Sequence, residues 1–283
     1  LGAVDSWGWE LSLKWNDKFG DDFRYWANLN LSQNQNEVID RKEAPQSNLY
    51  QYQKGHRIGA RSQYVFWRYY DEQTPDLYEQ TFHRPYPQQM AELRPGDAVY
   101  VDLNGDRKID VNDMSRDYGY TDDPEYNFGF SWKNWEFNSQ WTAAWNVSRM
   151  ISDVFRQPFT SATGPTTGGL LAYHLDNTWT PDNPSQSAKY PRPTWENATN
   201  NYASSTLYEK DSKYLRLKTL QLAYNFNFPW MKKLKMSTCQ LALSGYNLLT
   251  FTPYLWGDPE TRASNAPSYP LARTYTLSLK LGF

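Results

Sequence analysis

The sequence lacks the features of a disulfide-bonded, histidine-metal or helical membrane protein. Its single cysteine, Cys239, excludes a disulfide within the chain. None of its three histidines stands at metal-ligand spacing from another. No apolar run reaches the roughly 18 residues of a transmembrane helix. The formal net charge of -2 gives no strong field for nucleic acid, so no nucleic-acid partner is expected.

Catalytic motifs are missing as well. No histidine lies in a plausible nucleophile–base–acid arrangement, and no nucleophile elbow occurs. Pairs of acidic residues such as Asp122 and Asp123 are ordinary for polar loops. The sequence therefore offers no candidate catalytic residues.

Aromatic residues are abundant in an otherwise polar chain. They make up 17% of the sequence, with 13 Trp and 22 Tyr, although the mean hydropathy is -0.83. A high aromatic content and a low mean hydropathy are compatible if apolar side chains are confined to alternate positions of strands. A membrane β-barrel has this pattern, because lipid-facing and lumen-facing residues alternate along each strand.

Alternation of period two runs through much of the chain. In "WEFNSQWTAAWNVS", Trp135, Phe137 and Trp141 share one face and polar residues share the other. The run before it alternates equally well, and the two meet at the two-residue turn Lys133-Asn134. Similar runs predict about seven antiparallel strands. Their expected ranges are 7–15, 23–32, 126–132, 135–147, 213–228 with a bulge near Lys218, 238–251 and 273–283.

The connections between these strands alternate in length. Short ones are expected at 16–22, 133–134 and 229–237, and long ones at about 36–123, 149–212 and 252–271. Outer-membrane barrels have short periplasmic turns and long extracellular loops. The fold class is therefore all-β. Bacterial barrels have an even number of strands, so seven strands do not close one. Residues 1–283 are therefore expected to be the C-terminal portion of a large transmembrane β-barrel. The alternative is a soluble all-β domain with large insertions.

Residues 102–113, "DLNGDRKIDVND", have the spacing of a calcium-binding loop. The glycine expected in the middle of such a loop is replaced by Arg107, and no amphipathic helices flank it. We predict a structural calcium ion that braces the first long loop. The alternative is an acidic turn without metal. The predicted ligands are Asp102, Asn104, Asp106, the Lys108 carbonyl, Asp110 and Asp113.

Several stretches carry a resemblance to a known family. They are "GWELSLKWND", "PGDAVYVDLNGDRKIDVND", "DPEYNFGFSW", "NTWTPDNPSQSAKYPRP" and the tail from "DSKYLRLKTLQLAYNF" onward. In this order they resemble the C-terminal part of SusC/RagA-like TonB-dependent outer-membrane transporters of Bacteroidetes. Arg107 departs from the family pattern, which usually has glycine there.

The resemblance implies active import of glycans or oligosaccharides, or of peptides, across the bacterial outer membrane. Such import involves no covalent chemistry, so we predict that the protein is not an enzyme. The implied partners are the rest of the same transporter (its plug domain and N-terminal strands), TonB acting through that missing N-terminal part, a SusD-like surface lipoprotein, outer-membrane lipid and the glycan or peptide ligand. Two other hypotheses stay open: a secreted calcium-stabilised carbohydrate-binding β-domain, and an assembly-type barrel without a transport role.

Aromatic residues of the long loops are candidate ligand-binding residues. Flat rings can stack on sugars, although the same rings can instead pack the loops together. The candidates are Trp67, Tyr69, Trp179, Trp195 and Trp256. The terminal Phe283 is a candidate assembly signal, read by the machinery that inserts barrels, or simply the end of a strand.

Overall fold

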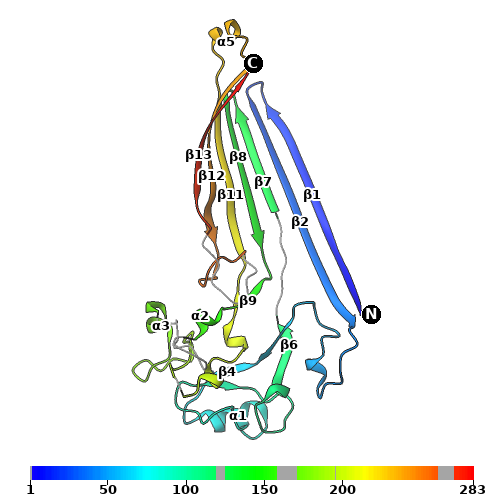
Figure 1. Ribbon diagram of the computed structural model, residues 1–283, viewed down its shortest axis with the longest axis vertical. Coiled ribbons are helices and arrows are strands. Elements are labelled where there is room, and N and C mark those ends of the chain that lie inside the picture. The colour runs from blue at the N-terminus through cyan, green and yellow to red at the C-terminus, as the bar shows by residue number, and fades with distance from the viewer. Residues whose placement is uncertain (1, 119–124, 158–170, 195, 261–270) are drawn as a thin grey trace.

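The computed structural model describes residues 2–118, 125–157, 171–194, 196–260 and 271–283. Its main element is a seven-stranded antiparallel sheet in the order β1-β2-β7-β8-β11-β12-β13 (Figure 1). Neighbours in the sheet are also successive long strands in the sequence. The bounds are β1 Ala3–Phe19, β2 Phe23–Asp40, β7 Glu125–Trp132, β8 Trp135–Ala144, β11 Tyr214–Asn225, β12 Thr238–Phe251 and β13 Thr274–Gly282.

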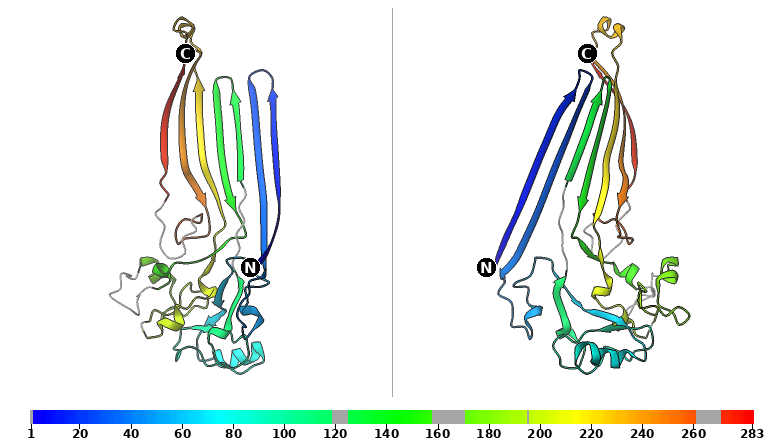
Figure 2. Two further views of the ribbon diagram at one scale, coloured as in Figure 1. Left: turned by 45° about the vertical axis from the view of Figure 1, so that its right-hand side comes forward. Right: turned by 180° about the vertical axis from the view of Figure 1, so that it is seen from behind.

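The short and long connections lie at opposite ends of the sheet. The turns after β1 and β7 and the connection after β11 share one end, at the top of Figure 1, and the long connections share the other (Figures 1 and 2). This arrangement matches the expected one. The connection after β11 contains a short helix that the sequence reading did not include, α5 (Pro229–Lys233).

The register confirms the predicted faces of the sheet. Trp132 pairs with Trp135, Phe130 with Phe137, and the rings of Phe130 and Phe137 stack with centroids 4.9 Å apart. The register of β11 shifts between Leu217 and Thr219 against both of its neighbours, which confirms the bulge predicted near Lys218.

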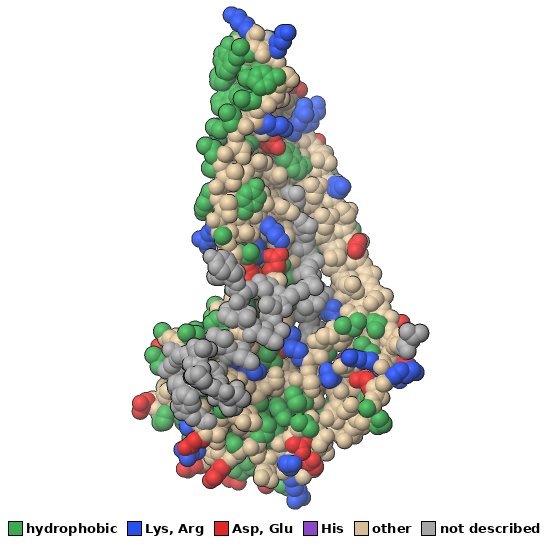
Figure 3. Space-filling view, viewed as in Figure 1, with side chains coloured by type: hydrophobic (Ala, Val, Ile, Leu, Met, Phe, Trp, Pro, Cys, Tyr) green, Lys and Arg blue, Asp and Glu red, His purple; other side chains and the backbone are tan. Residues whose placement is uncertain are grey.

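The apolar face of the sheet is widely exposed. Leu277 is 70% exposed, Leu279 61% and Phe251 57%. Figure 3 shows hydrophobic side chains gathered along the side of the molecule where β12 and β13 lie. A continuous apolar surface of this extent is unfavourable in water and is expected to be covered. No helix of the described residues is long and apolar enough to span a membrane.

The long connections fold into a structured region at the other end. Its described part contains three two-stranded sheets, β3–β6, β4–β5 and β9–β10. The strands are β3 Arg61–Tyr64, β4 Phe66–Tyr69, β5 Ala98–Tyr100, β6 Met114–Tyr118, β9 Ser148–Met150 and β10 Glu209–Asp211. The helices are α1 Thr74–Phe82, α2 Asp153–Arg156, α3 Ala172–Asn177 and α4 Ala198–Asn201, with 3₁₀ turns η1 Leu49–Gln51, η2 Val111–Asp113 and η3 Thr206–Tyr208.

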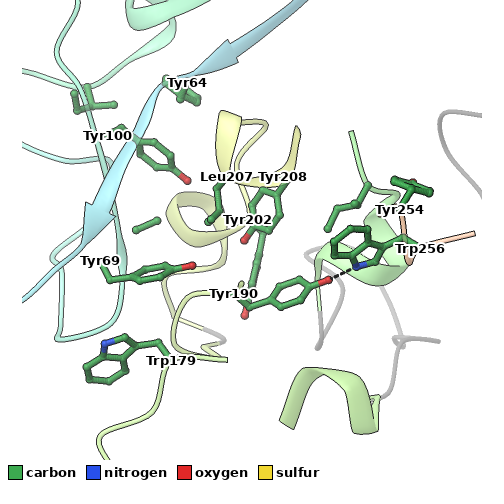
Figure 4. Packing of buried hydrophobic residues seen from close by; sticks show 13 residues of the cluster. Tyr64, Tyr69, Tyr100, Trp179, Tyr190, Tyr202, Leu207, Tyr208, Tyr254 and Trp256 are labelled. Carbon is green, nitrogen blue, oxygen red and sulfur yellow. Dashed lines mark hydrogen bonds between the residues drawn. The ribbon is translucent and has the colours of Figure 1, made fainter. Parts of the chain in front are cut away.

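The larger buried aromatic cluster of the described residues lies in this loop region. Tyr69, Tyr100 and Tyr208 are fully buried there, and residues from all three long connections contribute (Figure 4). The loops therefore form a packed unit of their own at one end of the sheet.

The first two strands extend further than predicted. β1 and β2 cover Ala3–Phe19 and Phe23–Asp40, where 7–15 and 23–32 were expected. The added residues are mostly polar, so hydrophobic alternation marks them poorly. The backbone pairing nevertheless continues as far as Ala3 and Asp40, beyond the apolar part of the strands.

Candidate functional site

The predicted calcium loop is closed by hydrogen bonds from its own backbone. Asp102 Oδ1 accepts from the Gly105 amide at 2.6 Å, and its Oδ2 accepts from the Arg107 amide at 2.9 Å. Asp113 accepts from the amides of Leu103 and Asp110, both at 2.9 Å. Asp102 and Asp113 are both buried. These two carboxylates organise the turn, because they accept the hydrogen bonds of its backbone amides.

Arg107 adopts the backbone conformation that the missing glycine would have supplied. Its φ is 68°, in the left-handed region, where a residue with a side chain is disfavoured by roughly 1–2 kcal/mol. Arginine in place of the glycine usual in the family therefore strains the backbone locally. The hydrogen bonds around Arg107 hold it in this conformation.

The loop is joined to the rest of the first long connection. The Tyr50 hydroxyl donates a hydrogen bond to the Asn112 carbonyl. The Gln88 amide donates to the Arg107 carbonyl at 2.9 Å, and the Ile109 amide donates to the Gln88 carbonyl at 2.8 Å. Burial, followed by the nearby aspartates, raises the pKa of Tyr50 to about 12. The predicted role of a brace fits these contacts.

The oxygen donors fit calcium in type but do not converge on one point. Asn104 Nδ2 donates to Asp106 Oδ2 at 2.9 Å, and Lys108 Nζ lies 3.1 Å from Asp110 Oδ2. Within the described ranges, no group of three or more Asp, Glu, His or Cys side chains is placed to hold a metal ion. Calcium binding at residues 102–113 therefore stays a prediction.

Calcium is expected to stabilise the loop if the acidic side chains turn inward around it. At an affinity of about 10⁻³ M, 10 mM calcium would add about 1.4 kcal/mol to the free energy of unfolding of the loop region. Protection of residues 102–113 from hydrogen exchange would measure this, with magnesium and Asp113→Asn as controls. Equal protection with calcium and with a chelator would contradict the prediction.

The candidate aromatic residues of the loops pack against one another. Tyr69 is fully buried, Trp179 is 5% exposed and Trp256 is 8% exposed. Trp256 Nε1 donates to the Tyr190 hydroxyl at 2.7 Å, as Figure 4 shows. Trp67 is half-buried, edge-on to the ring of Tyr78.

Burial of these rings leaves little of their faces for a sugar. Trp179 lies so close to Gly96, whose φ is +91°, that an added Cβ would come within 2.1 Å of its ring. Trp195 lies outside the described residues. The ligand-binding role stays a prediction, and in this structure the described rings serve the loop core.

Asp97 is a buried residue that contacts both the first and second long connections, and sequence reasoning did not identify it. Its side chain is fully buried, and it accepts two hydrogen bonds of 3.1 Å from Arg192. Asn197 Nδ2 and Asn201 Nδ2 each donate to it at 2.8 Å. These three side chains come from the second connection, and the Arg94 amide of the first connection also donates to Asp97 Oδ2 at 2.9 Å. One buried carboxylate therefore contributes to holding the two loops together.

Arg216 has a corresponding role for the third connection. It lies on the polar face of β11, with 3% of its side chain exposed. It pairs with Asp258 at 2.8 Å and with Glu260 at 2.5 Å, and Lys218 reaches Glu260 at 2.7 Å. These ion pairs fix the start of the third loop against the wall of the sheet.

Phe283 follows β13 directly and is 80% exposed. It lies at the end of the sheet where the short connections are, as the C-terminal label in Figure 1 shows. The position is compatible with a recognition signal and with a plain strand end, so its role as an assembly signal stays a prediction.

The sequence of the chain was compared with those of known proteins. No protein-family model matches the chain. TonB-dependent receptor P3 of Formosa agariphila is 25% identical over 309 residues, covering 100% of this chain and 29% of the relative. TonB-dependent receptor P26 of the same organism is 28% identical over 313 residues, with the same coverage. The chain is similar to TonB-dependent receptors throughout its length.

Solved structures support the same fold. The chain matches a RagAB peptide importer in its "open-open" state with a TM-score of 0.69 and 18% identity, covering 100% of this chain and 29% of that one. A second match, described as the RagAB peptide transporter, has the same values. The all-β fold, as part of a large barrel, and the outer-membrane location are thereby confirmed. The chain spans about 29% of the length of these relatives.

Proposed function

We propose that this chain is part of a TonB-dependent importer that carries oligosaccharides or peptides across the outer membrane. The observation that carries the proposal is the similarity to TonB-dependent receptors over the whole chain. The sheet supports it, because its exposed apolar face suits lipid and its opposite face carries polar and charged groups such as Arg216 and Lys218.

A SusD-like surface lipoprotein is the proposed partner on the loop side, and TonB, acting through the plug-containing part of the transporter, is the proposed energy source. The loops are longer than compact domains usually carry without a role. They are also folded into one unit around Asp97, which gives a partner a defined surface to bind. The proposed ligand is a glycan or a peptide.

The alternative of a secreted carbohydrate-binding domain is disfavoured by the sheet. A secreted domain would have to cover the apolar face, where Tyr275 is 69% exposed and Leu277 70% exposed. The relatives are named as receptors, which agrees with the prediction that the protein is not an enzyme.

Uptake by cells is the direct test of the importer. The full-length gene would be deleted, and uptake of fluorescent oligosaccharide and oligopeptide mixtures compared with the parent strain and with a strain lacking TonB. Loss of uptake of one class in both strains supports import and names the cargo. Unchanged uptake of both classes would refute the proposal.

Removing most of the second connection should weaken binding of the lipoprotein while the barrel still assembles. The variant is a full-length transporter lacking residues 155–205, and the measurement is co-purification of the lipoprotein with the tagged barrel. Because this deletion also removes the partners of Asp97, Asp97→Ala is the matched control for loss of loop folding alone. Co-purification at the wild-type level by the deletion variant would contradict the prediction.

A further inference from the structure

An apolar groove lies on the exposed face of the sheet, at the end of the long loops. Its volume is about 750 Å³, within the range of about 300–1,000 Å³ typical of ligand pockets. Its main lining side chains are Phe128, Trp141, Ala143, Trp145, Leu215 and Phe251. The groove therefore opens on the same face as the exposed apolar band of the strands.

The register explains why the surface is hollow at this place. Ala143 pairs with Leu215, which pairs with Phe251 on the next strand. Trp141 and Trp145 stand two residues before and after Ala143 on the chain. The small Ala143 is only 6% exposed, because it forms the floor between these larger side chains.

Further strands of a complete barrel would not cover the groove. Its floor lies on β8, β11 and β12, and each of these strands already has a partner on both sides. The strands with an open edge in this sheet are β1 and β13. Since the face is continuous with the membrane-facing band, lipid is the medium that the groove meets.

A cation stands at the rim of the groove. Lys213 lines it and has 59% of its side chain exposed. Its ammonium lies 2.8 Å from Asp211 Oδ2, and that ion pair uses only one of its three donors. It lies on the loop side of the groove, where the headgroups of the outer leaflet are expected because the long loops of outer-membrane barrels are extracellular.

We propose that the groove binds one acyl chain of a phosphorylated outer-leaflet lipid, with Lys213 contacting the phosphate. The floor at Ala143 receives the chain, and Trp141 and Trp145 lie on either side of it. The site would hold a lipid at the level where the sheet passes into the loop region. The inference rests on the outer-membrane location and does not depend on the imported cargo.

The test measures lipid retained by the full-length transporter. Native mass spectrometry would count lipid A molecules bound after titration with lipid A into delipidated protein. Ala143→Phe fills the floor and should weaken retention about tenfold, since the loss of about two methylene contacts has that effect. The matched control is Cys239→Phe, which adds the same ring to the apolar face at the far end of β12, where Cys239 pairs with Leu281.

A second variant tests the headgroup contact without filling the groove. Lys213→Ala should weaken retention of phosphorylated lipid A and leave retention of dephosphorylated lipid A unchanged. This comparison decides the matter if Ala143→Phe fails to assemble. Equal retention by Ala143→Phe and Cys239→Phe would overturn the proposal. So would a change from dimer to monomer in Ala143→Phe without a change in bound lipid, because the groove would then be an interface between copies.

Discussion

Replacing Asp97 by alanine is expected to unfold the loop region while the sheet stays assembled. The substitution leaves the Arg192 guanidinium and the side-chain amides of Asn197 and Asn201 without their shared acceptor. Breaking a buried ion pair by removing one partner costs about 3–5 kcal/mol. Since 20% of the Arg192 side chain is exposed, water can solvate part of it, so the lower end of this range is expected.

Limited proteolysis and hydrogen exchange of the full-length protein in detergent would measure this effect. We expect cleavage and fast exchange in residues 178–208, with unchanged protection of β8 and β11. Arg94→Ala is the control, because Arg94 and Glu196 form an ion pair in the same region with 63% and 66% of their side chains exposed. Exposed pairs contribute about 0–1 kcal/mol. An Asp97→Ala protein as protected as Arg94→Ala would show that the carboxylate does not hold the loops together.

The sheet could be predicted because its information is local. Alternation of apolar and polar residues over a short segment predicts which side chains share a face. The two-residue turn at Lys133-Asn134 then fixes the register of the strands on either side of it. Even the bulge near Lys218 was visible as a slip of the apolar phase from Leu217 to Leu220. Strand ends were less visible, because the polar ends of β1 and β2 have no apolar phase.

The loop region could not be predicted, because its contacts join residues far apart in the sequence. Asp97 contacts Asn201, 104 residues away, and Tyr69 donates its backbone amide to Gln186, 117 residues away. Pro95-Gly96-Asp97 reads as an ordinary turn in the sequence. Only the fold shows that Asp97 is buried and accepts hydrogen bonds from the side chains of Arg192, Asn197 and Asn201.

The aromatic candidates illustrate the same limit in another way. A tryptophan in a polar loop has the same sequence signature whether its ring meets a ligand or another ring. Trp179 and Trp256 are buried in the loop core, and this outcome depends on Gly96 and Tyr190, which no local pattern connects to them. The spacing of residues 102–113 was readable in the sequence, but calcium binding there stays a prediction, because spacing alone does not place the oxygens around an ion.

An arginine at Trp141 should prevent stable insertion of the sheet more than one on the opposite face. Trp141 lies on the apolar face, between Trp135 and Trp145, which stand near the two ends of this strand. A charge on the lipid side near the middle of the bilayer costs about 2–4 kcal/mol. Trp141 lies between the middle and the loop end of β8, so Trp141→Arg is expected to lose stability at the lower end of this range, about 2 kcal/mol, in urea unfolding from lipid vesicles, and to reduce the folded fraction on gels run without heating.

The control for this change must place the same charge on the polar face without a new repulsion. Thr142 is the nearest such position, but it pairs with Arg216, so an arginine there would face another buried arginine. Asn138 pairs with Gln221 and Gly129, and its neighbour Glu136 on the same face can attract a cation. Asn138→Arg should therefore cost less than about 1 kcal/mol. Equal losses in the two variants would mean that the aromatic face of β8 does not face lipid, and the orientation of the whole sheet would have to be reversed.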